Sequence, residues 1–400
     1  MEELVARHNP WWSGEQDIAL ARWGSWRVKW IPGWLEDLGL TPFSLNFVVG
    51  PRQVGKTTGI KLLIKRLLER CDPEGIFYFN CDFLPDLSSL RKVLDKYLDI
   101  KKVEGIENAY IFLDEITSVR EWWRIIKGYI DLGVFEEDVI TITGSSSLRL
   151  RGEAELFPGR RGMGRDITVY PLSFREFLRV NGLEVEARGD PEEDMGRLYK
   201  REYEVRGLFE IYLETGGFPL SINREPTADE QFIAALESET LKAGHSVQLT
   251  KEIIASIMRK APSPISFSTI GREIGVSYKT VQQYCEALKN LFVLETALYR
   301  GDGIEWRKER KFFFLDNFAA KALSLWSGEK PLEGAVYEWM VQSHLQRRFG
   351  SVYYFRDRYE IDSIAGDLKV EVKIGKPHRR YPRDVLILDE ENIHLFLSVI

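Results

Sequence analysis

The stretch GPRQVGKT at residues 50–57 decides the fold expected of this 400-residue chain. It fits GxxxxGK[ST] at every fixed position and lies between an apolar run, LNFVV, and an amphipathic segment, TGIKLLIKRLLER. In this setting the glycines let backbone N–H groups surround phosphates, and the helix start adds partial positive charge. We expect Lys56 to reach the β- and γ-phosphates of ATP and Thr57 to complete the shell of a Mg²⁺ ion. The expected nucleotide-binding residues are Gly50, Gly55, Lys56, Thr57 and Thr58.

An acidic pair, Asp114-Glu115, ends a second apolar run, AYIFLDE. At the carboxyl end of a strand, Asp114 would hold Mg²⁺ through water, and Glu115 would act as the general base that polarises the attacking water. A third run, VITITG, is followed by serines. Either Thr143 or Ser145 could sense the γ-phosphate there, and a serine-rich turn is the other interpretation.

Five arginines crowd residues 149–165, namely Arg149, Arg151, Arg160, Arg161 and Arg165. In an oligomer, Arg160 or Arg161 could reach the ATP of a neighbouring copy as an arginine finger. A solvated basic loop and a loop that binds nucleic acid are equally good interpretations.

The pattern of apolar runs along the chain predicts four regions. Strands alternate with amphipathic helices over 44–181, which indicates an α/β unit with a mostly parallel sheet and helices on both faces. The chain then turns helical until the turn cluster APSP at 261–264. The expected domains are a P-loop core with a Trp-rich start at 1–172, a helical region at 173–260, a winged helix at 261–312 and a smaller α/β domain at 313–400.

The third region has helix-turn-helix spacing followed by a hairpin. Helices are expected over 267–275 and 278–290, with Ser277 as the N-cap of the second. The residues expected to face outward near its start are Tyr278, Lys279, Gln282 and Gln283, where contacts with DNA are made. Eight basic against six acidic residues over 262–311 is a small excess for DNA binding, so a packing module is the alternative.

The last region holds a carboxylate–lysine arrangement. Asp362 and Glu371 lie on strands of a hairpin turned at 365–367, and alternation places Glu371 and Lys373 on one face. Such a group could bind Mg²⁺ and position a water against a phosphodiester. The alternatives are an ion-pair lattice and a fold that has lost its activity. A local basic patch suited to a phosphate backbone follows at Lys376, Arg379, Arg380 and Arg383, and a solvated charged turn is the alternative.

Together, residues 50–57, Asp114-Glu115, ITGSS, PGRRG, YPLSFREF and TGGFP resemble the AAA+-related P-loop ATPases of prokaryotes, many of them archaeal. The resemblance implies a helical lid with Gly217 near the nucleotide, a winged helix and assembly as a homo-oligomer. A break between two helices explains the glycines and the proline of TGGFP equally well. The C-terminal region resembles the PD-(D/E)XK nuclease core without its usual proline, which implies Mg²⁺ or Mn²⁺ held by Glu338, Asp362 and Glu371, with Lys373 steadying the nucleophile.

Composition limits the function classes. A net charge of −6 excludes a globally basic nucleic-acid coat, and three cysteines without ligand spacing argue against a metal or disulfide framework. No apolar run is long enough for a membrane span, and the first residues do not resemble a signal peptide, so a cytoplasmic protein is expected. The small numbers of Met and Cys favour a heat-adapted source. The sequence predicts a Mg²⁺-dependent ATPase that handles and cleaves DNA. The alternative is an ATP-switched regulator that binds DNA or protein without cleavage.

Overall fold

The computed structural model describes residues 2–145, 157–375 and 381–400. It divides into two compact units, Met1–Val169 and Tyr170–Ile400, which we call unit 1 and unit 2. Within the described residues, every helix is too short or too polar to cross a membrane.

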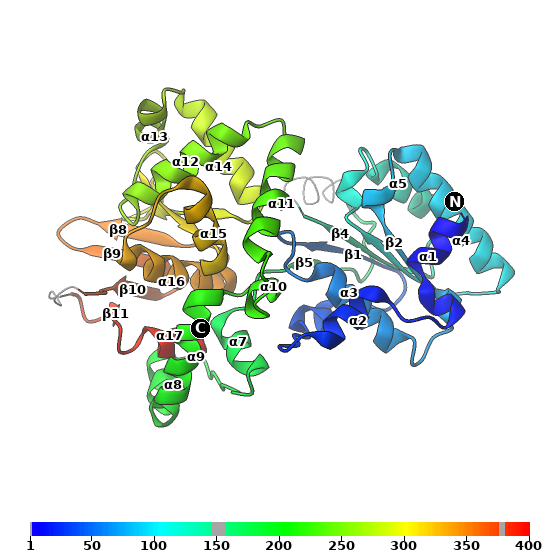
Figure 1. The fold of residues 1–400 in the computed structure, drawn as a ribbon, viewed down its shortest axis with the longest axis horizontal. Coiled ribbons are helices and arrows are strands. Elements are labelled where there is room, and N and C mark those ends of the chain that lie inside the picture. The colour runs from blue at the N-terminus through cyan, green and yellow to red at the C-terminus, as the bar shows by residue number, and fades with distance from the viewer. Residues whose placement is uncertain (1, 146–156, 376–380) are drawn as a thin grey trace. The chain divides into compact units, whose positions relative to one another are not determined.

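Unit 1 contains a five-stranded sheet in the order β2-β3-β4-β1-β5, with all neighbouring strands parallel (Figure 1). The predicted parallel α/β core is therefore confirmed. Its strands are β1 (Ser44–Val49), β2 (Ile76–Asn80), β3 (Tyr110–Asp114), β4 (Val139–Gly144) and β5 (Asp166–Thr168). Its helices are α1 (Glu2–His8), α2 (Ile18–Ser25), α3 (Lys56–Leu67), α4 (Leu87–Val103) and α5 (Trp123–Asp131).

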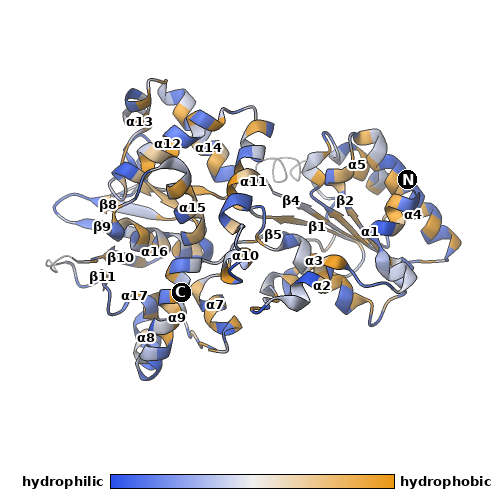
Figure 2. Ribbon diagram, in the orientation of Figure 1, coloured by the Kyte–Doolittle hydropathy of each residue, from blue (hydrophilic) through white to orange (hydrophobic). Residues whose placement is uncertain are grey.

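The strands of unit 1 are apolar because both faces of the sheet are covered, and Figure 2 shows this hydrophobic character along β1 and β4. On one face, Val48 packs with α3 and with the Trp-rich start of the chain. On the other face, the rings of Phe77 and Tyr97 stack 4.3 Å apart. A Cβ on Gly59 of α3 would lie 2.5 Å from the ring of Trp34, so the tryptophans approach this helix closely.

Unit 2 begins with helices and ends in a mixed sheet. The helices are α7 (Phe174–Val180), α8 (Pro191–Leu198), α9 (Glu202–Thr215), α10 (Pro219–Ile222), α11 (Ala228–Lys242), α12 (Val247–Lys260), α13 (Phe267–Ile274), α14 (Tyr278–Asn290), α15 (Asn317–Ser327), α16 (Glu333–Phe349) and α17 (Ile393–Val399). The strands are β6 (Leu294–Tyr299), β7 (Arg310–Phe314), β8 (Tyr353–Arg356), β9 (Glu360–Ala365), β10 (Leu368–Val372) and β11 (Leu386–Leu388).

The predicted helix pair forms at α13 and α14. Ser277 caps α14 by accepting a hydrogen bond from the Thr280 N–H, as expected, and Gly275 takes the left-handed conformation that the turn requires (φ 76°). The hairpin that follows consists of β6 and β7. Its assignment to a winged helix stays a prediction.

The six strands of unit 2 form one sheet in the order β11-β10-β9-β8-β6-β7. Leu298 of β6 pairs with Tyr353 of β8, so the expected wing is continuous with the C-terminal strands. The boundary predicted between residues 312 and 313 lies inside β7, and the division into four domains stays a prediction. A local turn signal cannot reveal a strand pairing made with residues further along the chain. Helix α16 packs against β7, β9 and β10.

Candidate nucleotide site and C-terminal charged cluster

The loop between β1 and α3 has the backbone that its glycines predict. A Cβ on Gly50 would lie 2.4 Å from the Val169 carbonyl oxygen, so only glycine fits there. Gly55 has φ 96° and stands immediately before α3, and Gln53 also has a positive φ of 64°. The loop thus curls ahead of a helix N-terminus, an arrangement suited to bind phosphate.

Lys56 is buried inside this loop. Its Nζ donates to the carbonyl oxygens of Gly50 (2.8 Å) and Pro51 (2.9 Å) and lies 3.5 Å from Oε1 of Glu115. These partners hold the ammonium within the loop, where the phosphate oxygens of a nucleotide would compete for it.

Asp114 lies at the end of β3 and is fully buried. Its Oδ2 accepts hydrogen bonds from Oγ1 of Thr57 (2.6 Å) and from the hydroxyl of Tyr78 (2.8 Å), and its Oδ1 accepts one from Thr143. Side chains from three neighbouring parallel strands and from the start of α3 thus meet at one carboxylate. Thr57 and Asp114, predicted as the Mg²⁺ residues, are brought together.

Glu115 follows directly and has the left-handed conformation (φ 50°, ψ 42°), which turns it out of the strand. Its N–H donates to Oγ1 of Thr143 at 2.9 Å. In the part of the chain that the structure describes, its buried Oε2 has no hydrogen-bond partner. A buried carboxylate oxygen without a donor is suited to take a proton from water, so these residues fit a nucleotide with Mg²⁺.

Sequence reasoning missed Tyr78, because its role depends on β2 lying beside β3 in the sheet. Burial and the charge of Asp114 hold the pKa of the Tyr78 phenol well above its usual value, so the hydroxyl stays protonated and donates. The Nζ of Lys61 lies 3.2 Å from the centre of the Tyr78 ring and 3.0 Å from Oδ2 of Asp17. Burial lowers the pKa of Lys61 to about 8 against the opposing effect of Asp17. The N-terminal segment therefore buttresses the tyrosine that orients Asp114.

The remaining predicted residues of unit 1 lie in different settings. Thr58 is half-buried in the first turn of α3, and Ser145 is buried after β4. Arg160 forms an ion pair with Asp131, and Arg161 forms one with Asp166. Both candidates for the arginine finger are therefore paired with a carboxylate of unit 1. The serines after Ser145, together with Arg149 and Arg151, lie outside the described residues.

Gly217 belongs to unit 2, and both of its backbone groups have partners there. Its N–H donates to Oδ2 of Asp316 (2.7 Å), and its carbonyl accepts from the Leu172 N–H (2.8 Å). A Cβ would lie 2.1 Å from the Leu172 carbonyl oxygen, which accounts for glycine at this position by packing alone. Its contact with the nucleotide stays a prediction.

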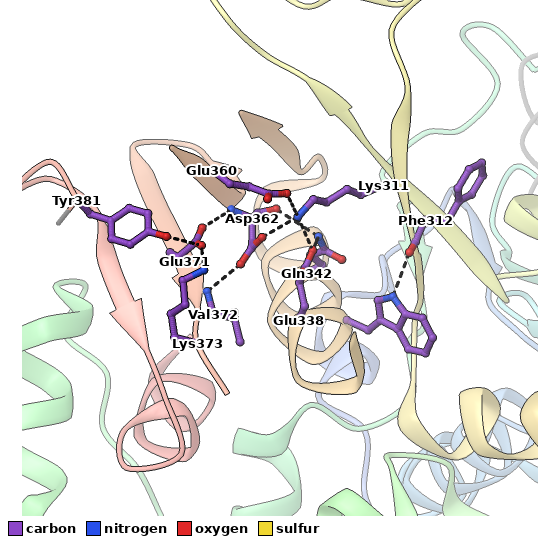
Figure 3. A network of polar contacts seen from close by, with 11 residues as sticks. Lys311, Phe312, Glu338, Gln342, Glu360, Asp362, Glu371, Val372, Lys373 and Tyr381 are labelled. Carbon is purple, nitrogen blue, oxygen red and sulfur yellow. Dashed lines mark hydrogen bonds and ion pairs between the residues drawn. The ribbon is translucent and has the colours of Figure 1, made fainter. Parts of the chain in front are cut away.

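The four predicted C-terminal residues come together, and four more polar residues join them. Figure 3 shows this group, which we call the C-terminal cluster; it consists of Lys311, Glu338, Gln342, Glu360, Asp362, Glu371, Lys373 and Tyr381. Lys311 projects from β7, where its Nζ contacts Asp362 at 2.6 Å, Glu338 at 2.9 Å and Glu360 at 2.9 Å.

The second half of the cluster is centred on Glu371. Its Oε2 accepts the N–H of Asp362 at 3.1 Å, and its Oε1 accepts from Lys373 and from the hydroxyl of Tyr381 (2.9 Å). Lys373 directly follows β10 and its ammonium contacts Glu371, while Asp362 meets Glu371 from the partner strand. Of the expected basic patch, Lys376, Arg379 and Arg380 lie outside the described residues.

Burial and mutual charge shift the pKa values of the cluster. Burial would lower the pKa of Lys311, but the surrounding carboxylates outweigh it and hold that pKa well above its usual value. Burial would raise the pKa of Asp362, but Lys311 brings it below its usual value. Burial and the charge of Asp362 raise the pKa of Glu371 to about 7 and place that of Glu338 well above its usual value. Glu338 and Glu371 each contact a lysine, but burial and the nearby charge of Asp362 outweigh that contact and favour their protonated forms.

Residues 43–178 match the family model of an AAA domain. This match covers the predicted loop, Asp114, Glu115 and Thr143, and it supports an AAA-type P-loop ATPase domain in this segment. Residues 206–330 match a model described as a domain of unknown function.

Two curated proteins align over most of the chain. An uncharacterised protein of Haemophilus influenzae is 27% identical over 349 residues, which span 80% of this chain and 79% of that protein. An uncharacterised protein of Methanocaldococcus jannaschii is 24% identical over 352 residues, spanning 82% of this chain and 73% of that protein.

Among solved structures, the ORC2 protein of Aeropyrum pernix has a TM-score of 0.40 and 13% identity, covering 79% of this chain and 95% of that one. The RuvB protein of Thermotoga maritima has a TM-score of 0.32 and 13% identity, covering 65% of this chain and 83% of that one. At these values the likeness does not extend to function.

Proposed function

We propose that this chain is a Mg²⁺-dependent ATP hydrolase that uses ATP binding and turnover to act on DNA. The observation that carries the proposal is the hydrogen bond between Thr57 and Asp114 at 2.6 Å, with Lys56 and the unpartnered oxygen of Glu115 beside it. Four side chains of the types needed for phosphoryl transfer thus converge where the start of α3 meets the end of β3.

Each residue has a role that follows from its position. Lys56 would exchange its carbonyl partners for phosphate oxygens, and Thr57 with Asp114 would hold Mg²⁺, which neutralises phosphate charge when bound. Glu115 would orient the attacking water and accept its proton. Thr143 would report on the occupied site, because it contacts both acidic residues through one hydroxyl.

Support for DNA as the partner comes from exposed groups in unit 2. At the start of α14, Tyr278, Lys279 and Gln283 are exposed, whereas Gln282 is half-buried. The loop between β6 and β7 exposes Arg307, Lys308 and 69% of Trp306. Cationic and aromatic side chains at a helix start and a hairpin tip suit a phosphate backbone and its bases. Assembly as a homo-oligomer, with Arg160 or Arg161 acting on a neighbouring site, is also part of the proposal and would require release from Asp131 or Asp166.

The direct test is phosphate release from ATP by the full chain. We expect hydrolysis with Mg²⁺, none with EDTA, and faster hydrolysis when duplex DNA is added. Lys279→Ala should weaken DNA binding about three- to tenfold and reduce its salt dependence, measured by anisotropy of a labelled duplex. Lys289→Ala, at the other end of α14 and paired with Glu295, is the matched control. Hydrolysis without any binding of DNA would remove DNA from the proposal.

Tyr78→Phe tests the residue that the sequence did not single out. The substitution removes one donor from Asp114, a hydrogen bond to a charged group worth about 1.5 kcal/mol, so kcat for Mg²⁺-dependent hydrolysis should fall about tenfold. Nucleotide affinity measured without metal should stay unchanged. Tyr97→Phe is the control, since Tyr97 is equally buried in unit 1 and donates to the Glu74 carbonyl instead. Equal kcat values for the two variants would contradict a positioning role for Tyr78.

A further inference from the structure

The C-terminal cluster contains a cation of its own. Lys311 is only 2% exposed, and its ammonium lies within 2.6–2.9 Å of oxygens from Glu338, Glu360 and Asp362. An ammonium has three hydrogen-bond donors, and here three carboxylates surround it. The centre of these carboxylates is therefore occupied by a protein group, as Figure 3 shows.

The carboxylates expected to bind a metal ion are engaged by protein donors. Oδ1 of Asp362 accepts from Lys311, and its Oδ2 accepts the Val372 N–H at 2.9 Å. Glu371 uses Oε2 for the Asp362 N–H and Oε1 for Lys373 and Tyr381. Oε1 of Glu338 accepts from both Lys311 and Gln342. A divalent ion would have to displace several of these donors to obtain its oxygen ligands.

The charges of the cluster are also partly offset internally. Lys311 of β7 contacts three of its carboxylates, and Lys373, which directly follows β10, contacts the fourth, that of Glu371. Across the described ranges 2–145, 157–375 and 381–400, no three Asp, Glu, His or Cys side chains are arranged to hold a metal ion. The residues present therefore do not fit the metal centre that a nuclease-like domain implies.

We infer that the ammonium of Lys311 takes the place of a divalent metal ion in the C-terminal cluster, so that this region is a metal-independent module that does not cleave phosphodiesters. Lys311 joins β7 to α16 and β9 from the centre of the cluster. Since the ammonium is buried among carboxylates, its removal would leave uncompensated charge inside the protein. Without the Lys311 ammonium, the carboxylate oxygens around it would be available to bind another cation.

Mn²⁺ binding to the full chain tests this inference. With nucleotide absent, Mn²⁺ bound to the protein is measured by the loss of its free electron-paramagnetic-resonance signal, for the wild type and for Asp362→Asn. We expect the two binding curves to coincide. A wild-type Mn²⁺ site that Asp362→Asn removes would overturn the inference, and this comparison does not depend on any lysine variant.

A second measurement tests whether Mn²⁺ can occupy the position of the Lys311 ammonium once that charge is removed. Lys311→Met keeps the length of the side chain without its charge, and it should gain Mn²⁺ affinity by about tenfold or more because the carboxylates lose their own counter-ion. If the variant is poorly folded without metal, Mn²⁺ should raise its thermal midpoint. Lys369→Met, which removes an exposed lysine paired with Asp384 on the same sheet, should leave Mn²⁺ binding unchanged. A Lys311→Met protein that neither binds Mn²⁺ better nor is stabilised by it would contradict the proposed exchange.

Discussion

Lys56→Ala is expected to lower the affinity for ATP by about 100-fold or more and to abolish hydrolysis, since a charge-assisted phosphate contact is worth about 3 kcal/mol. The ammonium already lies within the loop, held by two carbonyl oxygens, and alanine offers nothing in its place. Calorimetric titration of ATP into the full chain measures the first effect, and phosphate release measures the second.

Lys65→Ala is the matched control for this experiment. Lys65 is exposed and lies in the last turn of α3, so its removal changes the net charge equally without touching the loop. We expect it to bind ATP as the wild type does. Should Lys56→Ala also bind ATP with nearly wild-type affinity, the nucleotide site would have to be placed elsewhere.

Glu115→Gln is expected to retain ATP binding and to lose turnover by about 10²- to 10⁴-fold, the range assigned to a general base. Glutamine preserves the size of the side chain and can still contact Lys56, but its amide cannot accept a proton from water. The backbone N–H of residue 115 still donates its hydrogen bond to Oγ1 of Thr143, so the conformation at the end of β3 should not change. Single-turnover hydrolysis and ATP titration separate the two effects.

A nearby acidic residue provides the comparison for Glu115. Glu121 is partly exposed and pairs with Arg124 at 3.0 Å, so Glu121→Gln removes the same charge away from Asp114. Its hydrolysis rate should match the wild type. Hydrolysis by Glu115→Gln at that same rate would show that another group activates the water.

The nucleotide site could be predicted from the sequence because its information is local. The loop lies within eight consecutive residues, and the glycine conformations that it needs are properties of those residues. Asp114 and Thr143 end strands of one parallel sheet, and the carboxyl ends of such strands meet at one edge. The side chains at those ends were therefore expected at one edge of the sheet once the alternation of strands and helices was recognised. Tyr78 escaped prediction because the sequence does not say which strands are adjacent.

The C-terminal cluster marks the division between what the sequence alone determined and what only the tertiary structure decided. The alternation of side chains along the strands and a hairpin turn determined that Asp362, Glu371 and Lys373 converge, since these residues lie on or directly beside the two strands of one hairpin. The charge at their centre was decided by Lys311, which is 27 residues from Glu338 and 51 residues from Asp362. It arrives there because β6 pairs with β8 and draws β7 into the same sheet. A pairing between strands distant in the chain leaves no periodic signal in either strand. The sequence alone therefore determined which carboxylates converge, and only the tertiary packing decided that the ammonium of Lys311 lies among them.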